Sequence, residues 1–293
     1  MEEKKLTYVA HRLRDGKSLN PENSIEAYID AINNPYVGGL ELDIQQTKDG
    51  VFVLMNYKTI ENVTNLINPT KNKISDYTYD ELNEFEFFAN RLEIEKAIAN
   101  GAIEFGSDKD EMLNYYNNLK NSNILVKIPT LEEILKIDRN GKKLFIEIKT
   151  DYSKEQKYES IKYAKDLINV LGKYNLKDFI IIGRDTNTLE AIKQERQDIV
   201  CCPVIGYNDP EKATYGFDGV SVALNHLNMN IPYYNKPVWE YVLENGQEIA
   251  VWNLRTYQAL KEADDILGAT GIDYNPTGDF TGYLHEKTNK NIR

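Results

Sequence analysis

The sequence predicts an α/β fold in which a closed (β/α)8 barrel carries an insertion after its second strand. Short apolar runs alternate with amphipathic segments over most of the 293 residues, which is typical of parallel strands linked by helices. Eight such runs can be counted, the number that a closed barrel of this kind requires. Charged residues follow several of the runs, at the edge where such barrels carry their sites. A single domain is therefore expected over residues 1–293.

The apolar runs define the expected strands. They begin near Leu6, Leu40, Leu144, Phe179, Ile199, Phe217, Ile249 and Thr270. A further strand is expected from Val51 to Met55, paired with the second strand through the turn Lys48-Asp49-Gly50. The spacing of apolar residues predicts helices at Ser24–Ile32, Glu155–Leu171, Thr188–Glu195, Trp239–Leu243 and Thr256–Ala263.

Residues 66–128 interrupt this alternation. They are rich in Asn, Tyr, Glu and Lys, with helices expected around Tyr79–Ala89 and Asp108–Leu119. The pattern resumes with a helix that Thr130 and Glu133 open as a capping box. The segment is therefore interpreted as an insertion at the barrel mouth, where it would shape a binding site.

Composition limits the classes of partner. Charged residues make up 28% of the chain and its formal net charge is −11, which argues against a nucleic acid or an anionic membrane as the main partner. The chain offers neither a signal peptide nor a run long enough to span a bilayer, so a soluble, cytoplasmic protein is expected. Cys201 and Cys202 are adjacent and would point to opposite faces of a strand, which predicts buried thiols rather than a disulfide.

The second expected strand places two acids on one face. Leu40, Leu42 and Ile44 alternate with Glu41 and Asp43, so the aliphatic and acidic side chains point to opposite sides. Residues i and i+2 lie roughly 6.6 Å apart along a strand, so two poorly solvated carboxylates there would repel each other. Either the pair lies on the wet face of an edge strand, or a hard divalent cation compensates it.

Other charged residues are expected to converge on this pair. His11 and Arg12 end the first strand, and Glu147 and Lys149 share one face of the third. Because the C-terminal ends of barrel strands meet at one mouth, a third carboxylate and several cations would join the pair.

In motif content the chain resembles the glycerophosphodiester phosphodiesterase family, phospholipase-C-like TIM barrels. The motifs that carry the resemblance, in order, are His11-Arg12, Pro21-Glu22-Asn23-Ser24, Glu41-Leu42-Asp43, Thr47-Lys48-Asp49-Gly50, Pro129-Thr130-Leu131-Glu132-Glu133, Glu147-Ile148-Lys149, Val251-Trp252-Asn253 and Gly271-Ile272. The resemblance implies hydrolysis of a small-molecule glycerophosphodiester to an alcohol and glycerol 3-phosphate. It also implies one divalent cation, Ca²⁺ or Mg²⁺, held by Glu41, Asp43 and Glu147.

The resemblance assigns roles to further residues. His11 would act in acid/base transfer, and Arg12 and Lys149 would bind the phosphate, with Glu22 in the same site. Trp252 would either contact the substrate or pack in the barrel. A hard cation with Arg and Lys beside it suits the charge that develops on a phosphoryl group.

The chain departs from the family pattern at several positions. Asn56, followed by Tyr57, stands where a second catalytic histidine is usual, and Leu13 stands where a glycine usually follows His-Arg. Gly183-Arg184 replaces a usual Ser-Phe; Arg184 would either contact phosphate or be solvated. Near the C-terminus, Asp273-Tyr274-Asn275-Pro276 replaces Thr-Asp-x-Pro.

Two alternative functions stay open. The lost histidine is compatible with a catalytically impaired member that binds a phosphodiester or a protein partner. Barrels with paired carboxylates are also glycosidases, but those enzymes need carboxyl groups on both sides of the scissile bond. Glu41 and Asp43 would instead project in parallel from one strand.

Overall fold

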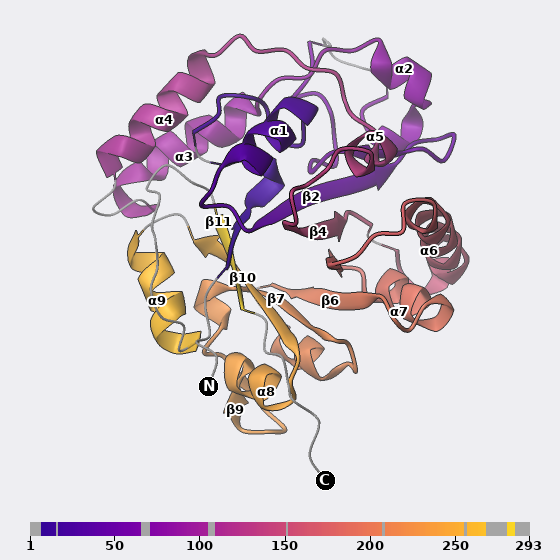
Figure 1. The fold of residues 1–293 in the computed structure, drawn as a ribbon, viewed down its shortest axis with the longest axis vertical. Coiled ribbons are helices and arrows are strands. Elements are labelled where there is room, and N and C mark those ends of the chain that lie inside the picture. The colour runs from indigo at the N-terminus through magenta and orange to yellow at the C-terminus, as the bar shows by residue number, and fades with distance from the viewer. Residues whose placement is uncertain are drawn as a thin grey trace.

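A closed barrel forms the centre of the molecule (Figure 1). The structure is a computed structural model and describes residues 7–15, 17–65, 71–104, 109–150, 152–206, 209–254, 257–267 and 280–284. Within these ranges eight strands close the ring, which confirms the α/β barrel. They are β1 (Thr7–Ala10), β2 (Gly39–Gln46), β4 (Lys143–Ile148), β5 (Phe179–Gly183), β6 (Val200–Ile205), β7 (Gly219–Ala223), β10 (Glu248–Leu254) and β11 (Phe280–Leu284).

One strand of the ring runs against the others. From β1 to β10 each strand pairs in parallel with the next, as expected. β11 then lies between β10 and β1 and is antiparallel to both. The strand predicted near Thr270 falls outside the described residues. β11 closes the ring because it pairs with edge groups that β1 and β10 would otherwise leave open.

Helices cover the outside of the barrel (Figure 1). They are α1 (Ile25–Asn33), α5 (Leu131–Leu135), α6 (Lys157–Gly172), α7 (Thr186–Glu195), α8 (Val238–Glu244) and α9 (Tyr257–Leu267). The predicted capping box of α5 is confirmed, because Thr130 and Glu133 exchange hydrogen bonds of 2.7 and 3.1 Å. Within the described part of the chain, no helix has both the length and the apolar character needed to cross a membrane.

Two apolar layers follow from the alternation along the strands. Leu40, Leu42 and Ile44 are fully buried in the layer between strands and helices. The inner layer contains Phe145 and residues of β1, β5, β6 and β10. Cys201 belongs to the outer layer and Cys202 to the inner one, and both are free thiols, as predicted.

Two short antiparallel pairs are added to the barrel. β3 (Phe52–Leu54) pairs with the end of β2, which confirms the strand predicted after Gly50. β8 (Asn230–Ile231) and β9 (Lys236–Pro237) form a separate hairpin before α8.

The segment between β3 and α5 contains α2 (Tyr79–Asn83), α3 (Arg91–Glu104) and α4 (Lys109–Asn121). α4 agrees with its prediction, α2 ends earlier than predicted, and α3 was not predicted. The first part of the segment packs on Val53 and Met55, next to the barrel. α3 and α4 pack on each other around a smaller apolar cluster, which also contacts Leu19, and Tyr115 of α4 donates a 3.2 Å hydrogen bond to the Ser18 carbonyl. An antiparallel bridge between Phe87 and Val126 joins the two ends of this helical pair.

We predict that a short Gly-Ser turn can replace residues 88–125 without unfolding the barrel. The Phe87–Val126 bridge brings the two cut ends together, so a tight turn can reconnect them. Thermal unfolding followed by circular dichroism should stay cooperative.

A larger deletion serves as the control. Removing residues 59–128 takes away the partners of Val53 and Met55 and should destabilise the barrel strongly. Loss of cooperative unfolding in the smaller deletion would show that α3 and α4 belong to the barrel core.

Candidate active site

Strand register brings three carboxylates together at the mouth of the barrel. Asp43 on β2 is paired directly with Glu147 on β4, and Glu41 precedes Asp43 by two residues on the same face. One carboxylate oxygen from each residue lies within 4.8 Å of the other two. The acidic triad Glu41, Asp43 and Glu147 thus arises from the period of two along each strand and from parallel pairing between them.

Glu41 is the least compensated member of the triad. Its side chain is buried, and Oε2 accepts a hydrogen bond of 2.6 Å from the backbone N–H of Arg12. Oε1 is also buried and has no hydrogen-bond partner among the described residues. Burial, and then the charges of Asp43 and Glu147, raise the pKa of Glu41 well above its usual range. Additional positive charge at this point would therefore be strongly favourable.

Asp43 is held on two sides. Asn23 donates a 2.8 Å hydrogen bond to its carboxylate and accepts one of 3.1 Å from its backbone N–H. Lys149 Nζ lies 2.8 Å from Asp43 and 2.5 Å from Glu147. Burial would raise the pKa of Asp43, but Lys149 and Arg12 lower it overall. Burial alone would lower the pKa of Lys149, but the three carboxylates of the triad raise it overall.

The turn after β1 presents His11 and Arg12 in an unusual backbone conformation. Arg12 and Leu13 have φ of 54° and 65°, in the left-handed region that favours glycine. The Leu13 side chain is fully buried, which holds this conformation in place. A glycine at position 13 would adopt it without strain. The strained turn directs the Arg12 N–H at Glu41.

The Arg12 side chain is fixed by neighbours outside the triad. Its guanidinium lies 3.3 Å from Glu22 and donates to the Tyr57 hydroxyl at 3.3 Å. It also lies 3.9 Å from Asp43. Glu22 pairs in addition with Arg14, at 3.4 Å. Glu22 therefore supports Arg12 and does not itself line the cavity described next.

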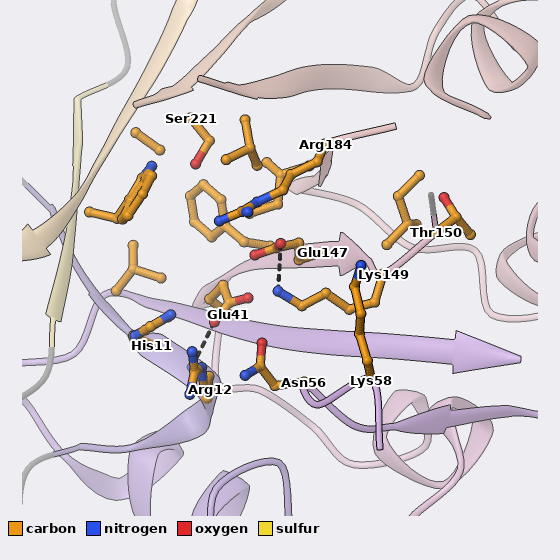
Figure 2. A pocket seen from close by; sticks show the side chains of 17 residues that line it. His11, Arg12, Glu41, Asn56, Lys58, Glu147, Lys149, Thr150, Arg184 and Ser221 are labelled. Atoms are coloured by element: carbon orange, nitrogen blue, oxygen red, sulfur yellow. Dashed lines mark hydrogen bonds and ion pairs between the residues drawn. The ribbon is translucent and has the colours of Figure 1, made fainter. Parts of the chain in front are cut away.

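A cavity of about 490 Å³ lies over the triad (Figure 2). Of the residues proposed from the sequence, it is lined by His11, Arg12, Glu41, Asn56, Glu147, Lys149 and Trp252. Asp43 lies behind this surface, fully buried. The indole Nε1 of Trp252 is buried without a hydrogen-bond partner among the described residues, so it can donate to a ligand.

Three residues have roles at the site that were not predicted from the sequence. Lys58 lines the cavity from the loop after β3, while Asn23 and Tyr57 fix Asp43 and Arg12. Arg184 is exposed to solvent and also lines the cavity, so the structure is compatible with both of its predicted roles, solvation and contact with a phosphate. No described residue of 66–128 lines the cavity, so the expectation that the insertion shapes the pocket is not met there.

The donor set of the triad fits a hard divalent cation. All three donors are carboxylate oxygens, the ligands that Ca²⁺ and Mg²⁺ prefer. Two ligands on opposite sides of a Ca²⁺ ion lie about 4.8 Å apart, given bonds of about 2.4 Å. The spacing of the triad and the unpartnered Glu41 Oε1 both agree with such an ion.

Comparison with known proteins gives one consistent result. The model of the glycerophosphoryl diester phosphodiesterase family matches residues 14–276. A curated glycerophosphodiester phosphodiesterase of Bacillus altitudinis is 26% identical over 127 residues, which are 42% of this chain and 49% of that protein. The match to this relative thus spans about half of its length.

Solved structures share the fold. A glycerophosphodiester phosphodiesterase from Parabacteroides distasonis superposes with a TM-score of 0.61 at 18% identity, covering 90% of each chain. A phosphodiesterase from Oleispira antarctica, solved with the product sn-glycerol-3-phosphate, gives 0.61 at 17% identity, over 92% of this chain and 93% of that one.

We predict that Glu41→Gln stabilises the protein in a chelating buffer, by about 1–3 kcal/mol at pH 7.5. Glutamine keeps the acceptor for the Arg12 N–H and removes a buried charge beside two other carboxylates. Because folding raises the pKa of Glu41, the wild type loses stability as pH rises from the ordinary value of 4.5 to the raised one. The advantage of the variant should grow over that interval, as measured by denaturant unfolding at several pH values.

Glu190→Gln is the matched control, because it removes an exposed carboxylate on α7. It should change stability little at any of these pH values. A Glu41→Gln variant that is less stable than the wild type at pH 7.5 would contradict the charge balance described for the triad.

Proposed function

The chain belongs to the glycerophosphoryl diester phosphodiesterase family, and we propose that it hydrolyses a glycerophosphodiester to an alcohol and glycerol 3-phosphate. The observation that carries this proposal is the acidic triad, set beside Arg12 and Lys149 in one cavity. The Oleispira antarctica relative, solved with sn-glycerol-3-phosphate, supports the same substrate class.

Glu41, Asp43 and Glu147 would hold one divalent cation, either Ca²⁺ or Mg²⁺. Such an ion supplies charge stabilisation at a phosphoryl oxygen. Arg12 would bind a second phosphoryl oxygen, because Glu22 and Tyr57 hold its guanidinium at the cavity wall. Lys149 carries a full positive charge beside the triad and would neutralise charge that develops during the reaction.

Hydrolysis forms a bond from a water oxygen to phosphorus and breaks the bond to the alcohol oxygen. One proton must leave the attacking water, and one must reach the departing alkoxide. His11 lines the cavity, and an imidazole side chain can serve as a general acid or base. Asn56 lines the same cavity but can only donate a hydrogen bond, so it would orient the leaving oxygen without protonating it.

The absence of a histidine at position 56 also favours a second function. A family member with slow turnover could act by binding a phosphodiester or a protein partner. A glycosidase is disfavoured, because the three carboxylates converge within 4.8 Å instead of flanking a bond from opposite sides.

We further propose that the chain acts as one domain on a small-molecule substrate in the cytoplasm. The net charge of −11 supports a partner other than nucleic acid. The two free, buried thiols of Cys201 and Cys202 support a reducing compartment.

We predict that calorimetry detects binding of one divalent cation and that Glu147→Gln weakens it by about tenfold or more, because it removes one of three charged oxygen ligands. Glycerol 3-phosphate release from several glycerophosphodiesters, with and without a chelator, tests the activity itself. Glu190→Gln should leave cation affinity unchanged. Equal affinity in Glu147→Gln and wild type would refute the assigned ligand set.

We predict that the wild type is slow on diesters of ordinary alkyl alcohols and much faster on a nitrophenyl diester. A nitrophenolate leaves without a proton, whereas an alkoxide needs an acid that Asn56 cannot be. General acid/base assistance is worth about 10²–10⁴-fold, or about 3–5 kcal/mol of barrier. Asn56→His should therefore raise kcat on alkyl diesters more than on the nitrophenyl one.

Asn56→Gln is the control, because it keeps the amide and adds no titratable group. Similar wild-type rates for both leaving groups, with the chemical step shown to be rate-limiting, would overturn this account of Asn56.

A further inference from the structure

The cavity concentrates positive charge in an acidic protein. Four of its lining side chains are cationic, namely Arg12, Lys58, Lys149 and Arg184, and two are anionic, although the chain as a whole carries −11. Such a local excess focuses the field on the cavity and favours anionic ligands there. Arg12 and Lys149 are the inner two of these cations, next to the triad, and Lys58 and Arg184 are the outer two.

The two inner cations are committed to protein carboxylates. Arg12 lies 3.3 Å from Glu22, and Lys149 lies 2.8 Å from Asp43 and 2.5 Å from Glu147. With the proposed divalent ion they sum to +4, which equals the −3 of the triad plus the −1 of a phosphodiester, while the charge of Glu22 is offset by Arg14, 3.4 Å away. The charge of Arg184 is then surplus to what a plain diester requires.

Arg184 carries this surplus charge. It follows β5 directly and forms no ion pair with any described residue. Its side chain is solvent-exposed, yet it extends into the cavity from the β5 wall (Figure 2). A guanidinium presents a planar set of donors that binds a carboxylate or phosphate with two parallel hydrogen bonds.

Lys58 adds a second outer cation from a different wall. It lies in the loop after β3, two residues beyond Asn56, and its side chain also extends into the cavity (Figure 2). A ligand seated over the triad would thus meet positive charge from β5 and from this loop. A cationic head group would be repelled by both.

We propose that the alcohol released by this protein carries a second anionic group, a carboxylate or a phosphate, which Arg184 binds with help from Lys58. This inference rests on the proposed function. The glycerol side of the substrate offers only hydroxyl groups, so the extra negative charge must lie on the leaving alcohol. The simpler reading, a solvated arginine, predicts no preference for charge on that alcohol.

Two matched substrate pairs test the proposal. Glycerophosphoserine and glycerophosphoethanolamine differ only by a carboxylate, and glycerophosphoglycerol can be compared with its terminal phosphate ester. For the wild type, kcat/KM for the anionic member of at least one pair should exceed that of its partner by about tenfold, equivalent to about 1.4 kcal/mol. The pair that shows the effect distinguishes carboxylate from phosphate.

The variant Arg184→Gln should reduce that ratio to about one, and Lys58→Gln should reduce it in part. Arg184→Lys should restore some of the preference. Arg196→Gln is the matched control, because Arg196 is an exposed arginine on the protein surface, paired with Asp198 and outside the cavity. It should keep the wild-type ratio.

A wild-type ratio near one for both pairs, or a ratio that survives Arg184→Gln, would overturn the inference while leaving diester hydrolysis intact. If neither these diesters nor a nitrophenyl diester is cleaved, the proposed function fails instead. In that case, the affinity of the cavity for each member of the two pairs is measured by calorimetry, in the wild type and in the same variants. Tighter binding of the anionic member that Arg184→Gln abolishes would support the inference, and equal binding of both members would overturn it.

Discussion

Three carboxylates on two adjacent buried strands set the main constraint on this structure. Parallel pairing aligns Asp43 with Glu147, and the period of two adds Glu41 to the same face. Ionised carboxylates in such a place are costly unless cations surround them. Lys149, Arg12 and the backbone N–H of Arg12 offset part of the free energy lost by burying these charges. The raised pKa of Glu41 indicates that the offset is incomplete.

The hydrogen bond that the Arg12 N–H donates to Glu41 depends on a strained backbone turn. The turn after β1 places two non-glycine residues at positive φ so that the Arg12 N–H reaches Glu41. Such strain persists only where the surroundings over-determine it. Here the fully buried Leu13 side chain fixes the turn, and Glu22 and Tyr57 fix the Arg12 side chain. The packing of the barrel end and the charge of the site are thus parts of one arrangement.

Much of this could be predicted from the sequence, because the relevant signals are local and periodic. Alternation along Leu40–Ile44 placed aliphatic and acidic residues on opposite faces, and the same period separated Cys201 from Cys202. What escaped prediction depends on contacts distant in sequence. β11 is a strand because β1 and β10 offer it partners, and Asn23 supports Asp43 from 20 residues away. Arg184 could not be distinguished from a solvated arginine, because its side chain is exposed to solvent and also lines the cavity.

Asn56 lines the cavity where the family resemblance predicts a histidine, and its neighbours bear on the role proposed for it. Positive charge near a leaving alkoxide would lower its energy even though Asn56 cannot protonate it. Lys149 is kept protonated by the triad, and Lys58 lies two residues beyond Asn56 in the same cavity wall. Both would stabilise negative charge electrostatically, whereas Asn56 can only donate a hydrogen bond. The proposed chemistry of the cavity therefore relies mainly on electrostatic stabilisation, and His11 is the one histidine among the described residues that line it.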